Sequence, residues 1–287
     1  MQIFMLSSSS AENRTRLGAT AGSRTTSRFE AARRDIREGL KMRELWLFLG
    51  WRDIKKHYSR SLLGPLWLTL SMGIMVAGLG VLYSAIFQID IRVYLPFLAI
   101  GFIMWGLIGN SITAACNVYS AASASIRQTQ LPYSVYVFQF VWTQLITFFH
   151  NFVIYIVIIV IFGIWPGANV LLFIPAMLLI TLNGIFTAMI LGPLCARFRD
   201  IPMIIASVVQ VSFFLTPIIW SAEQIPERAF FVGANPFYHF IEIARDPLLG
   251  GTGTLFNWLA CTAMTSLLGL VAFAFFARFR ARIAYWA

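Results

Sequence analysis

The stretch that decides the fold is 62-LLGPLWLTLSMGIMVAGLGVLYSAIF-87, which contains no charged side chain. A helix needs about 20 mainly apolar residues to cross the hydrocarbon core of a bilayer, and this run exceeds that length. Its glycines and its proline are compatible with a helix in a membrane, where both residues are common. We therefore expect a membrane-spanning helix here.

Five further apolar runs of similar length follow along the chain. They cover residues 94–118, 135–162, 170–196, 201–220 and 255–277. Each is long enough to cross a bilayer as a helix. The sequence therefore predicts an all-α membrane protein with six transmembrane helices.

The composition argues against an ordinary soluble protein. Hydrophobic residues make up 59% of the 287 residues and charged residues 12%, against about 25% charged residues in soluble domains. The net charge of +10 does not indicate a nucleic-acid partner, because 13 of the 22 Lys and Arg residues precede Leu62 and most others flank apolar runs. Cys116, Cys195 and Cys261 are widely spaced and odd in number, which predicts neither disulfides nor a metal site.

The positions of Lys and Arg also predict the orientation, because cytoplasmic loops of membrane proteins are enriched in these residues. With six spans and the N-terminus inside, 19 of the 22 lie in cytoplasmic segments, and Arg92, Arg228 and Arg245 lie outside. The opposite orientation would reverse this bias. We therefore expect both termini in the cytoplasm.

Two segments precede the first span. Residues 1–28 are rich in Ser, Thr, Ala and Arg, so we expect a disordered cytoplasmic tail. In residues 29–61, apolar residues recur at helical spacing opposite Arg and Lys, which predicts an amphipathic helix lying in the cytoplasmic interface. Residues 62–287 would then form the transmembrane domain.

The connection between the fifth and sixth spans, residues 221–254, carries four acidic residues and is interrupted by Pro226, Pro236 and Pro247. Its middle, residues 230–240, is aromatic and apolar but too short to cross a membrane. We expect short re-entrant or interfacial helices at the outer mouth, surrounded by protein or by a water-filled cavity. An ordinary surface loop is the alternative.

Two kinds of chemistry are missing from the sequence. No GxxxxGK[ST] phosphate-binding loop occurs, so the chain lacks the usual means of hydrolysing ATP. No Asp, Glu, Lys or Arg lies in the middle of a predicted span, where ion-coupled carriers and membrane enzymes place ionisable groups. His150 is the only candidate, and a helix–helix hydrogen bond explains it better than a proton relay.

Uncharged polar and aromatic side chains do occur within the predicted spans. They are compatible with a pathway for sugars, which favour aromatic faces and uncharged hydrogen-bonding groups. They are also compatible with interhelical packing and interfacial tryptophan belts, and both interpretations stay open for each residue. The candidate lining residues are Trp105, Asn110, Trp142, Phe213, Phe214 and Trp220.

The loop between the second and third spans, residues 119–134, begins with small helix-forming residues and ends near Pro132. We expect a short surface helix that can dock on a soluble partner. The candidate docking residues are Ala124, Ser125, Ile126, Arg127, Gln128, Thr129 and Gln130.

Five short motifs occur in order from about residue 40 to the C-terminus. They are 51-WRDIK-55 with 58-YSRSLLGPLW-67, then 131-LP-132, 197-RFRDI-201, 216-TPIIW-220 and 235-NP-236. None is diagnostic alone, but together they resemble the ABC-2-type permeases that export bacterial polysaccharides, the O-antigen and capsule group.

The resemblance implies a transport subunit rather than an enzyme, with no cofactor of its own. The permease would form a homodimer in the bacterial inner membrane, with the translocation path at the interface. Two copies of a separate ABC ATPase subunit would carry ATP and Mg²⁺ and drive export of a lipid-linked polysaccharide.

The resemblance also implies roles for individual residues. The docking loop would receive the ATPase stroke, and the broken segment in the outer loop would form a periplasmic gate. Cations near the interface would attract the lipid diphosphate, although a role as topology anchors explains them equally well. The gate residues would be Asn235, Pro236, Phe237 and Tyr238, and the head-group residues Arg52, Lys55, Lys56 and Arg60.

Two other functions remain open at this point. One is a drug or lipid exporter of the same superfamily. The other is a membrane-embedded glycosyl- or acyltransferase, for which His239, Glu242 and Asp246 are the densest group of candidates, at no recognisable catalytic spacing.

Overall fold

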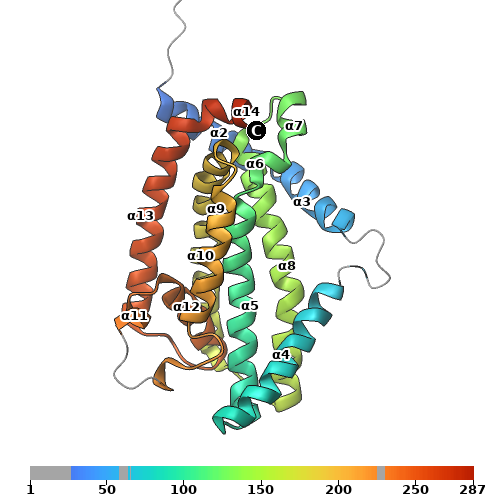
Figure 1. Ribbon diagram of the computed structural model, residues 1–287, viewed down its shortest axis with the longest axis vertical. Coiled ribbons are helices and arrows are strands. Elements are labelled where there is room, and N and C mark those ends of the chain that lie inside the picture. The colour runs from blue at the N-terminus through green and yellow to red at the C-terminus, as the bar shows by residue number, and fades with distance from the viewer. Residues whose placement is uncertain (1–26, 58–63, 65, 225–229) are drawn as a thin grey trace, which may run out of the picture.

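A computed structural model describes residues 27–57, 64, 66–224 and 230–287. All regular structure in these residues is helical, which confirms the predicted all-α class (Figure 1). The elements are α2 Arg28–Lys41, α3 Arg43–His57, α4 Leu66–Phe87, α5 Ile91–Ala115, α6 Val118–Ala121, α7 Ser123–Gln128, α8 Tyr133–Phe162, η1 Gly167–Leu172, α9 Phe173–Arg197, α10 Ile201–Leu215, η2 Ala222–Gln224, α11 Phe230–Gly233, α12 Pro236–Leu248, α13 Leu255–Phe279, η3 Arg280–Arg282 and α14 Ile283–Trp286.

Five helical segments in the described residues are long and apolar enough to cross a membrane, namely α4, α5, α8, α9 with η1, and α13 with the short helices after it. They match five of the six predicted spans within a few residues. The predicted span at 201–220 is shorter in the structure, because α10 ends at Leu215 after 15 residues. The next residue, Thr216, is extended (φ −97°, ψ 135°), as expected of a residue that precedes a proline.

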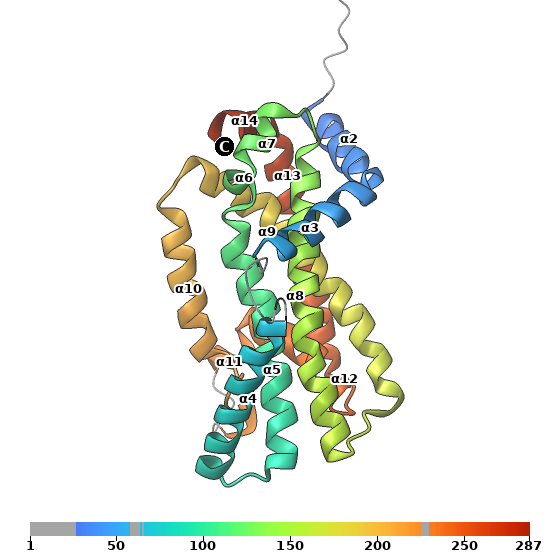
Figure 2. The same cartoon turned by 90° about the vertical axis from the view of Figure 1, so that its right-hand side faces the viewer.

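Helix α5 lies at the centre of the bundle, between α4 and α10 on one side and α8 and α9 on the other (Figure 2). Leu98, Ile100, Ile103 and Met104 of α5 are fully buried and form the middle of the larger hydrophobic core. Helices α4 and α10 contribute little to that core. Of the 22 residues of α4, all of them described, Val76 and Gly80 are buried.

The N-terminal segment forms two helices where the sequence predicted one. Helix α2 ends at Lys41 and α3 begins at Arg43, while residues 58–61 of the predicted helix lie outside the described residues. The break lets α2 pack against α8 and α13 while α3 packs mainly along α8. Gly39 is needed where α2 contacts α8, because a Cβ at this position would lie 2.2 Å from the Ser134 Oγ.

Two pairs of short helices occupy opposite ends of the bundle. Helices α6 and α7 lie at the same end as α2 and the C-terminal α14, and α11 and α12 lie at the other end (Figure 1). Helix α12 packs on α5, α9 and α13, so it folds back into the bundle as the prediction of a re-entrant segment required. Helix α7 ends at Gln128, before Pro132, also as predicted.

Candidate functional site

An aromatic cluster joins α5, α10 and α12. The Trp105 ring lies 5.6 Å from that of Phe213 and 5.5 Å from that of Phe237, measured between centroids. These distances are typical of attractive edge-to-face and tilted aromatic pairs. The structure therefore brings two candidate lining residues, Trp105 and Phe213, against the candidate gate residue Phe237.

Two more candidate lining residues extend the cluster along α10. The Phe213 and Phe214 rings lie 5.2 Å apart, and the Trp220 Nε1 donates a hydrogen bond to the Phe214 carbonyl at 3.4 Å. The Phe214 side chain is 65% exposed, so this part of the cluster reaches the open surface of α10. Phe102 also contacts Phe213, at 5.7 Å, and the sequence analysis did not single it out.

Asn110 and Trp142 lie apart from this cluster. Asn110 is exposed on α5, beyond Trp105 toward the end that carries α6. Trp142 belongs to α8, and its ring packs at 6.5 Å against Trp46 of α3. The position of Trp142 fits the attachment of α3 to the bundle, which was one of the two interpretations left open by the sequence.

Asn235 ties the start of α12 to the end of α10. Its Oδ1 accepts from the Phe237 backbone N–H at 2.9 Å, which caps α12 with Pro236 in the first helical position. Its Nδ2 donates to the Thr216 Oγ1 at 2.9 Å and to the Leu215 carbonyl at 3.4 Å. Asn235, the first of the gate candidates, therefore links the start of α12 by hydrogen bonds to the residues at which α10 ends.

The backbone carbonyls released where α10 ends are bonded by side chains from other helices. Arg245 of α12 donates to the Pro217 carbonyl at 3.0 Å, and the Tyr94 hydroxyl of α5 donates to the Ile219 carbonyl at 2.6 Å. Gly101 of α5 permits the approach, since a Cβ there would lie 3.2 Å from the Ile218 carbonyl. Irregular backbone at membrane depth requires such partners because lipid provides none.

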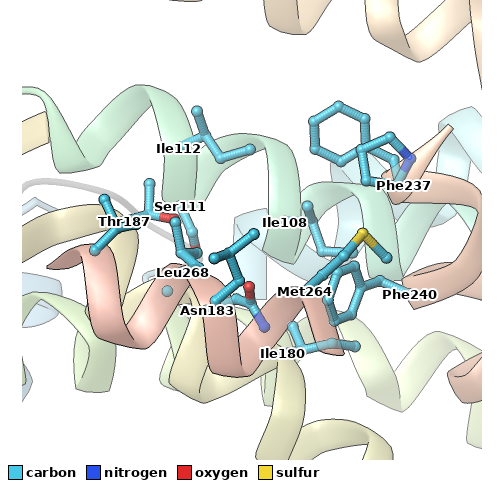
Figure 3. A pocket seen from close by; sticks show the side chains of 14 residues that line it. Ile108, Ser111, Ile112, Ile180, Asn183, Thr187, Phe237, Phe240, Met264 and Leu268 are labelled. Carbon is cyan, nitrogen blue, oxygen red and sulfur yellow. The ribbon is translucent and has the colours of Figure 1, made fainter. Parts of the chain in front are cut away.

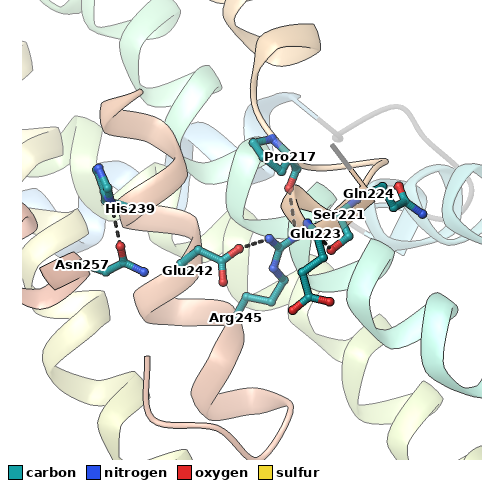
Figure 4. Close-up of polar contacts among 8 residues, drawn as sticks. All are labelled: Pro217, Ser221, Glu223, Gln224, His239, Glu242, Arg245 and Asn257. Atoms are coloured by element: carbon teal, nitrogen blue, oxygen red, sulfur yellow. Dashed lines mark hydrogen bonds and ion pairs between the residues drawn. The ribbon is translucent and has the colours of Figure 1, made fainter. Parts of the chain in front are cut away.

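Arg245 is a buried cation that the sequence analysis counted only as an external charge. Its side chain is 2% exposed, pairs with Glu242, and lies 3.9 Å from the centroid of the Phe97 ring (Figure 4). Burial of a charge is tolerated where a counter-ion and hydrogen bonds surround it. A signal for this role was present in the sequence, because Glu242 and Arg245 stand three residues apart on an amphipathic helix.

His239, Glu242 and Asp246, the candidate catalytic residues of the transferase hypothesis, do not form one hydrogen-bonded group in the structure. The ring of His239 is engaged by the Asn257 Oδ1 at 2.8 Å and by the Gly233 carbonyl at 3.0 Å, whereas Glu242 pairs with Arg245 (Figure 4). Asp246 lies beside Glu242. Burial, followed by the charge and the hydrogen bond of Glu242, raises the pKa of Asp246 to about 7.

Glu242, Arg245 and Asp246 face a cavity of about 820 Å³ at the α11–α12 end of the bundle. Tyr238, the last of the gate candidates, and Arg92 also line it. The cavity therefore combines carboxylates, the guanidinium groups of Arg92 and Arg245, and aromatic rings at the end of the bundle that carries α11 and α12.

The docking candidates lie at the opposite end, on α7 and just after it. The Ile126 side chain is buried, and the Ser125 Oγ lies 3.1 Å from the Tyr136 hydroxyl of α8, so these two residues hold α7 to the bundle. The other docking candidates are exposed at the surface of the molecule, namely Ala124, Arg127, Gln128, Thr129 and Gln130.

Two of the four head-group candidates share a cleft of about 420 Å³ between α3, α6 and α8. Arg52 and Lys56 line it together with Asn117 and Ser125. Lys55 instead lies 5.9 Å from the Trp51 ring centroid, and Arg60 falls outside the described residues. The cleft therefore places two cations next to the helix that carries the docking residues.

A buried ion pair at the same end was also missed. Asp35 of α2 is almost fully buried and accepts from the Arg280 Nε at 2.5 Å and from the backbone N–H of Ser134 at 2.9 Å and of Tyr133 at 3.2 Å. It thereby caps α8 from a different helix, where a negative charge is favourable. The local sequence of α8 begins with Pro132 and gives no sign of this cap.

Comparison with known proteins gives one family and several relatives. The family model described as ABC-2 type transporter matches residues 44–249. A protein from Klebsiella pneumoniae named O-antigen export system permease protein RfbA is 27% identical over 209 residues, covering 70% of this chain and 78% of the relative. A protein of the same name from Myxococcus xanthus is 26% identical over 205 residues, with the same coverage.

Proposed function

Because the chain belongs to the ABC-2 type transporter family, we propose that it is the permease of an exporter for a lipid-linked polysaccharide of the O-antigen or capsule type. Members of this family are non-catalytic, multi-pass membrane subunits that bind no cofactor themselves and work with an ABC ATPase. The cargo is suggested by the relatives from Klebsiella pneumoniae and Myxococcus xanthus, whose names specify O-antigen export.

The observation that carries the proposal is the aromatic cluster of Trp105, Phe213, Phe214 and Phe237. Aromatic faces stack on the apolar faces of sugar rings, and a neutral surface suits a long polymer that must slide rather than bind tightly. The cluster lies where α5, α10 and the gate helix α12 meet. Its exposed edge at Phe214 leaves it accessible from the open side of α10.

A homodimer would complete the path. Helices α4 and α10 both pack on α5 and leave large apolar surfaces open, including Ile74 at 63% exposure and Val211 at 58%. Lipid can cover such surfaces, but a hydrophilic glycan needs a wall of protein. A second copy facing α4 and α10 would supply that wall.

The cytoplasmic parts of the proposal lie at one end of the molecule. Helices α2, α7 and α14 share that end, as expected if both termini face the cytoplasm of a bacterial inner membrane (Figure 1). The exposed residues of α7 would receive the ATPase. Arg52 and Lys56, with Lys55 and Arg60 near them in sequence, would attract the lipid diphosphate before export.

Deletion and complementation in the source bacterium test the function. We expect the deletion strain to lose polysaccharide from the cell surface and to accumulate the lipid-linked form inside. Wild-type protein and Trp165→Ala should restore the surface signal, because Trp165 is 86% exposed and lies outside the cluster. Trp105→Leu, which keeps an apolar side chain but removes the aromatic face, should restore it poorly.

Three outcomes would overturn the proposal. The first is normal surface polysaccharide in the deletion strain. The second is purified protein that hydrolyses ATP without a partner subunit, and the third is protein that never co-purifies with an ABC ATPase at native expression. Full export by Trp105→Leu would refute the role of the cluster while leaving the family assignment unaffected.

A further inference from the structure

A second cavity, of about 400 Å³, lies inside the bundle between α5, α9, α12 and α13. It is separate from the polar cavity at Arg245 and from the cleft at Arg52. Figure 3 shows Ser111 and Thr187 at one end of it, Asn183 near the middle, and Phe237 and Phe240 at the other end. All four helices contribute to its walls.

The walls of this cavity suit an apolar occupant. Among the described residues no charged side chain lines it, and most of the lining is Ile, Leu, Met and Phe. The NH₂ group of Asn183 is occupied within the protein, since its Nδ2 donates to the Thr265 Oγ1 at 2.7 Å and to the Leu179 carbonyl at 2.8 Å. Water would fill the space poorly, because roughly a dozen molecules of about 30 Å³ each would find few partners.

The cavity is continuous with the surface that faces lipid. Leu267 of α13 lines it and is 64% exposed, and Leu270, one turn further along, is 71% exposed. Helix α13 is one of the five membrane-spanning segments, so its exposed side chains lie in hydrocarbon. Whatever fills the cavity therefore enters sideways from the bilayer, and the neutral apolar material available there is the acyl chain of a lipid.

We infer that this cavity holds one acyl chain of a membrane lipid. The chain lies along the cavity, between Phe237 and Phe240 at one end and Ser111 and Thr187 at the other.

The position of Phe237 gives the bound chain a structural effect. One side of this residue lines the cavity, and its ring also contacts Trp105 at a centroid distance of 5.5 Å. An acyl chain behind Phe237 supports α12 against α5, as a core side chain would. The site does not depend on what the protein exports.

Photo-crosslinking tests the inference with the full chain in nanodiscs of phosphatidylethanolamine and phosphatidylglycerol. The probe is phosphatidylethanolamine with a diazirine in one acyl chain, and adducts are mapped by mass spectrometry. We expect adducts on the cavity walls around Asn183–Thr187 and Met264–Leu268. Met264→Trp, which puts a larger side chain into the cavity, should reduce them strongly, whereas Leu270→Trp on the lipid-facing side of the same helix should retain them.

The inference is overturned if folded Met264→Trp keeps the wall adducts, or if adducts are distributed evenly over lipid-facing positions such as Leu270. Folding is checked by size-exclusion elution and thermal unfolding, and Leu268→Phe replaces Met264→Trp if that variant does not fold. The assay involves neither the ATPase nor a glycan, so its failure would leave the proposed export function standing.

Discussion

The Arg245 Nη1 donates a hydrogen bond to the Pro217 carbonyl at 3.0 Å, so α12 is bonded to the backbone just beyond the end of α10. The same guanidinium pairs with Glu242 and lies over Phe97 of α5. One buried side chain thus connects α12, α5 and the end of α10.

Arg245→Met should destabilise the protein by about 3–5 kcal/mol, the usual cost of leaving one member of a buried ion pair alone. The Pro217 carbonyl would lose its donor, and the largely buried Glu242 would lose its counter-ion. Thermal unfolding in one detergent measures the loss. Arg92→Met, an exposed residue of the same cavity, is the matched control.

The double variant Arg245→Met with Glu242→Gln separates the two causes. Removal of the unpaired carboxylate should recover part of the stability, and the remaining loss belongs to the Pro217 carbonyl and the Phe97 contact. Equal unfolding temperatures for Arg245→Met and wild type would contradict the structural role of Arg245.

Asp35→Ala should lower stability by about 1.5–3 kcal/mol, the range for hydrogen bonds to charged groups. Its partner Arg280 keeps access to water at 26% exposure, so the cost stays below that of a fully buried pair. Glu38→Ala, exposed one turn further along α2, should have little effect. Hydrogen exchange should also quicken in the first turn of α8, and unchanged exchange there would refute the capping role of Asp35.

Stability should fall as the pH rises from about 4 to about 7. The folded state raises the pKa of Asp246 from 3.8 to about 7, so in this window the folded protein holds a proton that the unfolded chain releases. Below this window Asp246 is protonated in both the folded and the unfolded state. Above it Asp246 is ionised in both states, and the folded state carries the full cost of burying the carboxylate. Unfolding temperatures of wild type and Asp246→Asn across this range test the effect.

The Asp246→Asn profile should be flatter than that of wild type between these pH values. Asp200→Asn, at an exposed position before α10, should keep the wild-type slope. Parallel profiles for wild type and Asp246→Asn would show that other groups govern the pH dependence.

The double variant Arg127→Glu with Gln128→Glu should abolish export while leaving membrane insertion and stability intact. Both side chains are exposed on α7, so the change alters only the surface that we propose as the docking site of the ATPase. Co-purification of the ATPase subunit and surface polysaccharide are the two measurements. Arg33→Glu, exposed at the same end on α2, is the control, and normal ATPase recovery with the α7 variant would exclude α7 as the docking element.

The fold was predictable where a single helix carries its own signal. Long apolar runs predicted five spans within a few residues, and proline positions predicted the short helices at both ends. The premature end of α10 was also encoded in Thr216–Pro217, because the residue before proline leaves the helical region, but the apolar run beyond it masked that signal.

The contacts of the candidate site were predictable only in part. Residue type singled out Trp105 and Phe213 as aromatic candidates, and the resemblance to a known family singled out Asn235. The roles of Arg245 and Asp35 depend on carbonyl and N–H groups 28 and about 99 residues away. Such partners are set by the packing of whole helices, which hydrophobic periodicity does not specify.

The early end of α10 has a consequence for the surrounding bilayer. Fifteen helical residues span about 22 Å, short of the roughly 30 Å of a typical hydrocarbon core. A span with this hydrophobic mismatch is accommodated when the lipid next to it thins or the helix joins a neighbour. If α10 faces a second copy, the apolar barrier is narrowest along the line where cargo would cross.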